Sequence, residues 1–175
     1  MSKTSIIIPT FNRPAELTQC IRSVTEQTVK PSELILVDDG ELSTFPLKDD
    51  CESAGIQCRY HKKSQPGLTA SRNAGIAMAT GEILFFLDDD VELFPDYVEE
   101  ILRAYALSNG SPVMGVGGII ANSEPVTVFQ RGRHFFDRLF LVSGPCEGKV
   151  LRSGFSTDYG STGRPLSDIT DVDFL

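Results

Sequence analysis

The stretch EILFFLDDDV, residues 82–91, runs an apolar segment directly into three consecutive aspartates, Asp88, Asp89 and Asp90. Like charges side by side repel one another, and a buried carboxylate without a partner is costly enough that it is normally protonated or paired with a cation. We therefore expect a positive group beside these acids. The alternative is that the strand has reached the surface, where solvated aspartates favour the amino end of a following helix that Pro95 opens.

Strand-like and helix-like segments alternate on both sides of this stretch. In chain order, the sequence predicts a strand at 4–8, a helix from 14, strands at 33–39 and 57–61, a helix from 68, the strand that ends at the aspartates, and a helix at 95–107. Such alternation with short connections favours an α/β fold with a mostly parallel sheet flanked by helices. An apolar stretch follows at 113–121, and the loop-rich segment after it contains no strand that we can place.

Polar residues gather where three of the predicted strands end. Pro9 and Thr10 follow the first strand, Asp38 and Asp39 close the second, and the aspartates at 88–90 follow the fourth. Ligands of open α/β sheets bind at the carboxyl ends of the strands, where these residues converge. For Asp38 we favour a structural role, because an acid before a turn often bonds neighbouring backbone amides.

The acidic triplet has the chemistry of a cation site. Side chains alternate across a strand, so Asp88 and Asp90 are predicted to face one side, while Asp89 faces the other as a third acceptor. Hard carboxylate oxygens suit Mg²⁺ or Mn²⁺, which typically take one or two carboxylates and fill the shell with phosphate oxygens and water. We therefore expect Asp88 and Asp90 to hold a divalent cation.

Composition narrows the class of protein. The chain has 175 residues, 41% of them hydrophobic, and a formal net charge of -8, which argues against nucleic acid and anionic membranes as partners. The four cysteines, Cys20, Cys51, Cys58 and Cys146, show no CxxC spacing, so we expect reduced thiols in a cytoplasmic protein. No apolar stretch approaches the ~20 residues that span a bilayer, so we expect membrane contact to be peripheral at most.

Four separated stretches, SIIIPTFNR, LILVDDG, GLTASRNAGI and GEILFFLDDDV, are similar in order and spacing to the nucleotide-binding half of the family 2 inverting glycosyltransferases, which adopt the GT-A fold. The resemblance covers about residues 3–121. It implies a nucleotide-sugar-binding GT-A core at 1–121. The segment 122–175 then leads toward an acceptor-binding half that we expect to be truncated here.

The resemblance also implies roles for individual residues. The acidic triplet corresponds to the DxD-type motif, which binds a divalent cation and the sugar diphosphate. The arginine of the Arg-Asn pair, Arg72, corresponds to a diphosphate ligand. The nucleotide-sugar site implied in this way consists of Pro9, Thr10 and Phe11 on the nucleobase, Asp39 as an acceptor from the base, Arg72, Asp88 and Asp89, with Asp88 and Asp90 on the metal.

The function implied is transfer of a sugar from a nucleotide-diphosphate sugar to an acceptor hydroxyl, with inversion and with help from Mn²⁺ or Mg²⁺. The acceptor is open between a glycan, a lipid-linked molecule and a small molecule. The catalytic base is unassigned, because the sequence places none of the late acids Asp168, Asp171 and Asp173. The alternative is a sugar-nucleotide-binding module or fragment without turnover.

Two other classes fit fewer of these features. LILVDDG also resembles the acidic pocket of a receiver-type signalling domain, but that class leaves PTFNR and DDDV unexplained. A dinucleotide-binding Rossmann protein is disfavoured, because GVGGII lacks the GxGxxG spacing and follows no suitable strand-to-helix turn.

Overall fold

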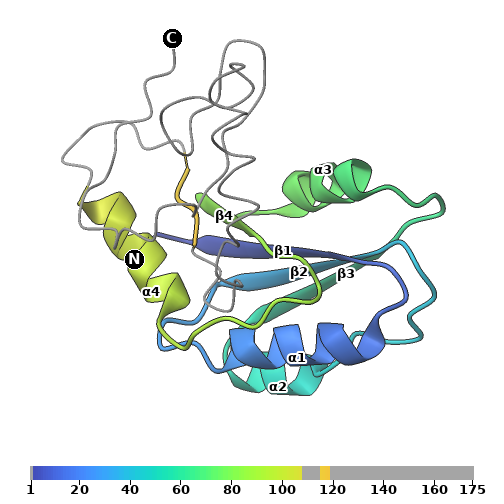
Figure 1. The fold of residues 1–175 in the computed structure, drawn as a ribbon, viewed down its shortest axis with the longest axis horizontal. Coiled ribbons are helices and arrows are strands. Elements are labelled where there is room, and N and C mark those ends of the chain that lie inside the picture. The colour runs from blue at the N-terminus through green and yellow to red at the C-terminus, as the bar shows by residue number, and fades with distance from the viewer. Residues whose placement is uncertain (1, 108–114, 119–175) are drawn as a thin grey trace, which may run out of the picture. The chain divides into compact units, whose positions relative to one another are not determined.

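The computed structural model describes residues 2–107 and 115–118 (Figure 1). The chain divides into two compact units, Met1–Gly110 and Ser111–Leu175. Every helix and strand that the structure describes lies in the first unit, and residues 115–118 of the second have neither. The predicted loop-rich segment from 122 onward, with Asp168, Asp171 and Asp173, lies outside the described residues.

Strands and helices alternate through the first unit. The strands are β1 (Thr4–Thr10), β2 (Glu33–Asp38), β3 (Gln57–Lys62) and β4 (Ile83–Phe86), and the helices are α1 (Pro14–Thr25), α2 (Lys48–Ser53), α3 (Leu68–Met78) and α4 (Tyr97–Ala106). The strands form a parallel sheet in the order β3-β2-β1-β4. The predicted α/β fold with a parallel sheet flanked by helices is therefore confirmed.

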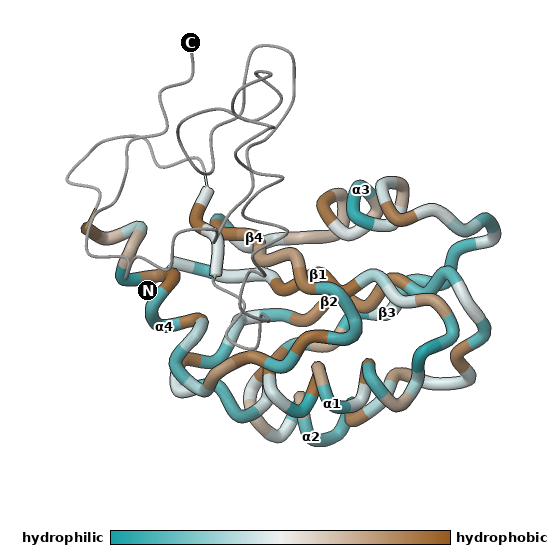
Figure 2. The backbone as a smooth tube through the Cα atoms, viewed as in Figure 1, coloured by the Kyte–Doolittle hydropathy of each residue, from teal (hydrophilic) through white to brown (hydrophobic). Residues whose placement is uncertain are grey.

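The sheet is the middle of three layers. α1 and α2 lie on one face of it and α3 lies on the other (Figure 1). On the α3 face, Ile7, Ile35 and Val37 are fully buried and pack with Ala74 and Met78. Every residue of β1 and β2 is buried, as predicted for strands covered on both sides. Figure 2 accordingly shows hydrophobic residues along these strands and a mixture along the helices.

β1 is longer than predicted and runs to Thr10, so Pro9 lies in a strand and not in the loop. The backbone N–H of Leu87 donates to the carbonyl of Ile7 at 3.1 Å, which shows that the backbone polar groups of Ile7 point toward β4. The backbone of Pro9, two residues later, points toward the same neighbour, but β4 has already ended at Phe86. The missing N–H of proline therefore costs no ladder hydrogen bond here.

Other boundaries also differ from the sequence prediction. β4 ends at Phe86, so the acidic triplet lies in the following loop. α4 begins at Tyr97, two residues later than predicted, and the Pro95 carbonyl instead accepts the N–H of Thr28 at 2.7 Å. The sequence predicts no helix between residues 39 and 57, but the structure has the helix α2 there. Its only buried residue is Cys51, so it has no apolar periodicity.

The three cysteines in the described part of the chain, Cys20, Cys51 and Cys58, are free, as expected for reduced thiols. Burial raises the pKa of Cys20 and of Cys51 to about 12, so both are protonated thiols at neutral pH. None of the described helices has the length and apolar character needed to cross a bilayer.

A buried glutamate fixes the amino-terminal edge of the sheet. Oε1 of Glu33 accepts from the Ser5 hydroxyl at 2.6 Å, and from the Thr80 backbone N–H and hydroxyl at 2.6 and 2.8 Å. Nε of Arg59 lies 3.3 Å from Oε2. Burial raises the pKa of Glu33, but the hydrogen bonds from Ser5 and Thr80 and the charge of Arg59 outweigh burial, and the net pKa lies below its usual value.

We expect Glu33→Gln to lower the free energy of unfolding at pH 7 by about 1–3 kcal/mol, because it removes the charged partner of Arg59. A lowered native pKa contributes stability above the unfolded value of about 4.3, and this contribution is lost as the pH falls through the native pKa. The variant should therefore lose less stability than the wild type in acid. Urea denaturation at several pH values measures both effects.

The exposed Glu52, which pairs with Lys48 at 3.6 Å, provides the control. Glu52→Gln should stay within about 0.5 kcal/mol of the wild type. Equal stabilities of the Glu33 variant and the wild type at pH 7 would contradict a stabilising role for the buried charge.

Candidate functional site

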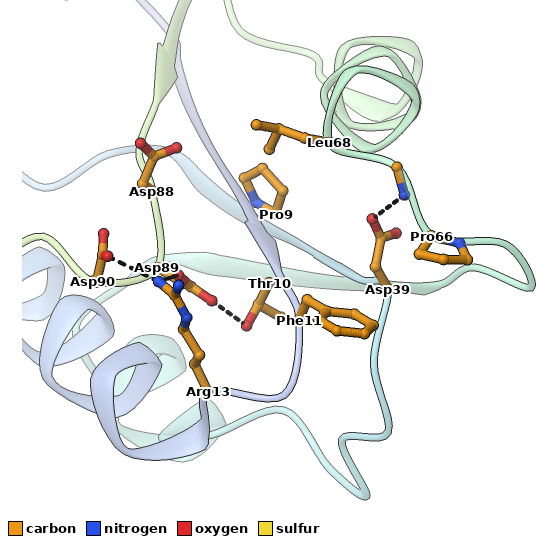
Figure 3. A pocket seen from close by; sticks show the side chains of 11 residues that line it. Pro9, Thr10, Phe11, Arg13, Asp39, Pro66, Leu68, Asp88, Asp89 and Asp90 are labelled. Atoms are coloured by element: carbon orange, nitrogen blue, oxygen red, sulfur yellow. Dashed lines mark hydrogen bonds and ion pairs between the residues drawn. The ribbon is translucent and has the colours of Figure 1, made fainter.

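A cavity of about 390 Å³ opens at the carboxyl ends of β1, β2 and β4, on the edge opposite Glu33 (Figure 3). It brings together all of the predicted site residues except Arg72, which reaches it through Asp88. The lining consists of Pro9, Thr10, Phe11, Arg13, Asp39, Pro66, Gly67, Leu68, Asp88, Asp89 and Asp90.

Asp89 ties the acidic loop to the end of β1. Its side chain is 9% exposed, and its Oδ2 accepts the Thr10 hydroxyl at 2.7 Å. Its Oδ1 lies 3.5 Å from Nη1 of Arg13. The carboxylate thus has one strong protein partner and one weak one, which leaves Oδ1 the more available oxygen.

Asp88 and Asp90 are exposed, and each is bound by an arginine. Nη2 of Arg72 donates to Oδ1 of Asp88 at 2.9 Å, and Nη1 of Arg13 donates to Oδ2 of Asp90 at 2.9 Å. These guanidinium groups are the positive charge that the sequence predicts beside the triplet. The other oxygens of Asp88 and Asp90 have no protein partner among the described residues.

The alternation of the triplet agrees with the prediction, although its cause differs. Asp88 and Asp90 are exposed while Asp89 is buried. The three residues follow the end of β4, so the pleat of a strand does not impose this pattern. The hydrogen bond from Thr10 turns Asp89 inward and leaves its neighbours outside.

Asp39 lies at the other end of the cavity, and its side chain is 7% exposed. Its carboxylate accepts the Ser71 hydroxyl at 2.7 Å, the Gly67 backbone N–H at 2.9 Å, and Nζ of Lys63 at 3.0 Å. Burial raises the pKa of Asp39. The hydrogen bonds from Ser71, Gly67 and Lys63 lower it by more than burial raises it, so the net pKa lies below its usual value. Asp39 therefore remains ionised and retains part of its capacity as an acceptor.

Asp38 has the structural role that the sequence suggests. Its carboxylate accepts the backbone N–H groups of Gly40 at 2.7 Å and Leu42 at 3.1 Å, and also bonds Tyr60 and Lys62. Burial and the hydrogen bond to Asp38 raise the pKa of Tyr60 to about 12. Asp38 thus shapes the loop after β2 and does not line the cavity.

Glycine at position 40 lets two loops meet beside the cavity. A Cβ atom on Gly40 would collide with the side chain and the backbone of Asn12. Asn12 has a φ of 56° and accepts the backbone N–H of Glu41 at 2.9 Å through its side-chain oxygen. The close approach holds the loop that carries Phe11 against the loop that follows β2.

Apolar side chains form part of the cavity wall. Phe11 and Leu68 are 56% and 52% exposed, which is high for large hydrophobic residues. In Figure 3 the ring of Phe11 lies near Asp39, and Pro66 lies on the other side of Asp39. A flat apolar surface next to a hydrogen-bond acceptor is suited to a planar heterocycle.

Two cations at the site, Arg13 and Lys63, were not among the predicted residues. Arg13 is the last letter of the quoted PTFNR stretch, and the expected positive group could have been sought there. Lys63 gives no such signal, because it follows β3 in a polar run that resembles a solvated loop. Its contact with Asp39 arises only from the tertiary fold.

The donor set can be compared with the needs of a divalent cation. No group of three or more His, Cys, Asp or Glu side chains that could hold a metal ion occurs in the part of the chain described. Mg²⁺ and Mn²⁺ commonly take one or two carboxylates and complete their shells with phosphate oxygens and water. Asp88 and Asp90, each with one oxygen lacking a protein partner among the described residues, fit that requirement.

Comparison with known protein families gives a match over most of the chain. The model of the family described as "Glycosyl transferase family 2" matches residues 5–157. A relative from Staphylococcus aureus, poly(ribitol-phosphate) beta-N-acetylglucosaminyltransferase TarP, is 31% identical over 144 residues. That match covers 75% of this chain and 42% of the relative, so the chain spans less than half of the relative's length.

Solved structures share the fold. S. aureus TarS 1–349 in complex with UDP has a TM-score of 0.51 at 22% identity, over 71% of this chain and 39% of that one. The mannosyltransferase PcManGT from Pyrobaculum calidifontis, in complex with GDP-Man and Mn²⁺, has a TM-score of 0.51 at 20% identity, over 58% and 32% of the two chains. The predicted GT-A fold is confirmed.

The two kinds of aspartate in the triplet should differ in their effect on stability. We expect Asp89→Ala to lower the free energy of unfolding by about 1–3 kcal/mol, because it leaves the buried Thr10 hydroxyl without its acceptor. Asp90→Ala should change it by no more than about 0.5 kcal/mol, since lost pairing with Arg13 is offset by relief of like-charge repulsion. Urea denaturation in the presence of EDTA measures both. A large loss for Asp90→Ala would instead mark that residue as structural.

Proposed function

The chain belongs to glycosyl transferase family 2, and we propose that it forms the donor-binding part of a glycosyltransferase that uses a nucleotide-diphosphate sugar with Mn²⁺ or Mg²⁺. In this proposal the sugar passes to an acceptor hydroxyl in a single inverting displacement. The observation that carries the proposal is that the cavity combines apolar side chains beside Asp39 with the carboxylates of Asp88 and Asp90.

Asp88 and Asp90 are the residues proposed to hold the cation. When bound, the cation neutralises charge that develops on the departing nucleotide diphosphate. The proposal is supported by the exposure of both carboxylates, by their shared cavity and by the oxygen that each can still offer. Oδ1 of Asp89 is proposed to accept a hydrogen bond from a hydroxyl of the sugar or ribose, because Oδ2 already accepts the Thr10 hydroxyl.

Arg72 is proposed as a diphosphate ligand. Its Nη2 bonds Asp88, whereas its buried Nε has no hydrogen-bond partner among the described residues. A buried charged donor without a partner is costly, and a phosphate oxygen or a bridging water could satisfy it. An arginine at this position also suits the bidentate geometry of a phosphate.

Asp39 is proposed to read the nucleobase, with Phe11 packing against the ring. A carboxylate offers about four lone-pair sites, and the three donors Ser71, Gly67 and Lys63 occupy most of them. About one further donor can therefore be accepted. Uracil and thymine present one ring N–H on their pairing edge, whereas guanine presents a ring N–H and an adjacent amino group, so the count favours uracil or thymine over guanine.

The acceptor is proposed only as a hydroxyl-bearing glycan, lipid-linked molecule or small molecule. A binding module without turnover is the second candidate, and one observation favours it for the described residues. All four carboxylates that line the cavity are engaged: Asp39 and Asp89 by hydrogen bonds, Asp88 and Asp90 by arginines. A general base for the acceptor is therefore assigned to none of them.

Metal removal tests the cation role. We expect UDP to bind at least about tenfold more tightly in Mn²⁺ than in EDTA, because a cation held by Asp88 and Asp90 would offset the negative charge of the diphosphate. Asp90→Asn should remove most of this difference, and Asp49→Asn, at an exposed acid on α2, should preserve it. Titration calorimetry gives the affinities, and equal UDP affinity in Mn²⁺ and EDTA would remove the metal role from the triplet.

Base preference tests the role of Asp39. In saturating Mn²⁺ we expect UDP and dTDP to bind about tenfold or more tightly than GDP, because guanine leaves a donor unpaired at Asp39. Ser71→Ala frees an acceptor site and should narrow this ratio, whereas Ser53→Ala, at an exposed serine, should not change it. The same calorimetry decides, and a wild type that prefers GDP would refute the assignment.

A further inference from the structure

Arg13 lies between the acidic loop and the open cavity. Its Nη1 is 2.9 Å from Oδ2 of Asp90 and 3.5 Å from Oδ1 of Asp89, and the residue lines the cavity. Figure 3 shows its guanidinium directly in front of Asp89, with Asp90 alongside. An ordinary surface ion pair can have this geometry, but here one of its carboxylates is a proposed cation ligand.

We propose that Arg13 is an exchangeable counter-ion: it competes with the divalent cation for Asp90 before ligands bind, and it binds a diphosphate oxygen when the cation takes its place. The inference rests on the proposed function, because it assigns Asp90 to the cation and the cavity to a nucleotide diphosphate.

The charges of the site favour such an exchange. Asp88, Asp89 and Asp90 carry three negative charges. The ion pairs with Arg13 and Arg72 contribute two positive charges, so one negative charge is not balanced. A divalent cation at Asp90 would place two further positive charges beside the guanidinium of Arg13. Like charges a few ångströms apart repel one another strongly. The arginine is therefore driven away from Asp90, toward any anion in the cavity.

The local structure allows the side chain of Arg13 to move while the backbone stays in place. The side chain is 53% exposed, whereas its backbone carbonyl accepts the N–H of Leu17 at 3.0 Å in the first turn of α1. Departure of the guanidinium does not strand a buried charge, because Asp89 keeps its 2.7 Å hydrogen bond from Thr10.

The two arginines of the site differ in this respect. Arg72 extends from α3 and its Nε is buried, so its guanidinium is partly fixed. Arg13 precedes α1, lines the cavity, and has no fully buried side-chain donor that lacks a partner in the described part of the chain. A planar guanidinium that is released near a diphosphate can form two parallel hydrogen bonds to it.

The test uses Arg13→Met, which keeps the apolar stem, and Arg13→Lys, which keeps the charge. Arg103→Met is the matched control, because Arg103 is 57% exposed and pairs with Glu100 at 2.9 Å on α4. Calorimetry measures two constants for each protein: the affinity for Mn²⁺ alone, and the affinity for UDP in saturating Mn²⁺. Thermal unfolding confirms that each variant is folded.

Arg13→Met is expected to shift the two constants in opposite directions. Affinity for Mn²⁺ alone should rise about three- to tenfold, because the competing charge is gone. Affinity for UDP in Mn²⁺ should fall about tenfold, because a charge-assisted hydrogen bond is lost. Arg13→Lys should bind Mn²⁺ as weakly as the wild type and UDP with intermediate affinity, and Arg103→Met should match the wild type in both.

Unchanged constants in Arg13→Met, or a fall in its Mn²⁺ affinity, overturn the exchange. Failure of the proposed function has a different signature, since the wild type then binds no nucleotide diphosphate with or without metal. That result refutes the diphosphate half of the inference as well. The titration with Mn²⁺ alone still decides whether Arg13 competes at Asp90.

Discussion

The structure at the carboxyl edge of the sheet depends on the neutralisation of closely spaced aspartates. Asp39 forms an ion pair with Lys63, while Asp88 and Asp90 are each bound by an arginine. Any of these carboxylates without its cation would face the desolvation cost or the repulsion of its neighbours. The cations come from three different segments, namely the loop before α1, the loop after β3, and α3. Forming the cavity therefore requires the whole parallel sheet to be assembled.

The opposite edge obeys the same constraint with a different outcome. Glu33 is fully buried there, and its partners Ser5, Thr80 and Arg59 come from β1, the segment before β4, and β3. Its contacts lie within the protein, and it does not line the cavity. An ionised group enclosed by its partners stabilises a fold, whereas one with spare acceptor capacity beside a cavity can bind a ligand. Asp39, Asp88 and Asp90 belong to the second kind.

The sequence predicts the parts of this arrangement that local pattern controls. β1 and β2 are identifiable as unbroken apolar runs, and the rule that ligands meet the carboxyl ends of strands is enough to bring Asp39 and Asp88 to one site. Arg13 and Lys63 are not predictable in this way, because a cation in a polar loop has the same local pattern whether it is solvated or paired with an acid far along the chain. The helix α2 is not predictable from the sequence, because it buries only one residue and therefore shows no helical period of apolar residues.

The pairing of the triplet with two arginines has a consequence for how the ligands of this site would be coupled. Under the proposed exchange, a cation alone must displace Arg13, and a diphosphate alone meets carboxylates and an arginine that is already engaged. Each ligand removes the obstacle to the other, so cation and diphosphate bind with a favourable coupling free energy, and by linkage each strengthens the other by the same factor. A site built only of exposed aspartates would bind the cation first and independently. Engagement of the arginines by acids, seen at 2.9 Å for both Arg13 and Arg72, instead favours joint binding.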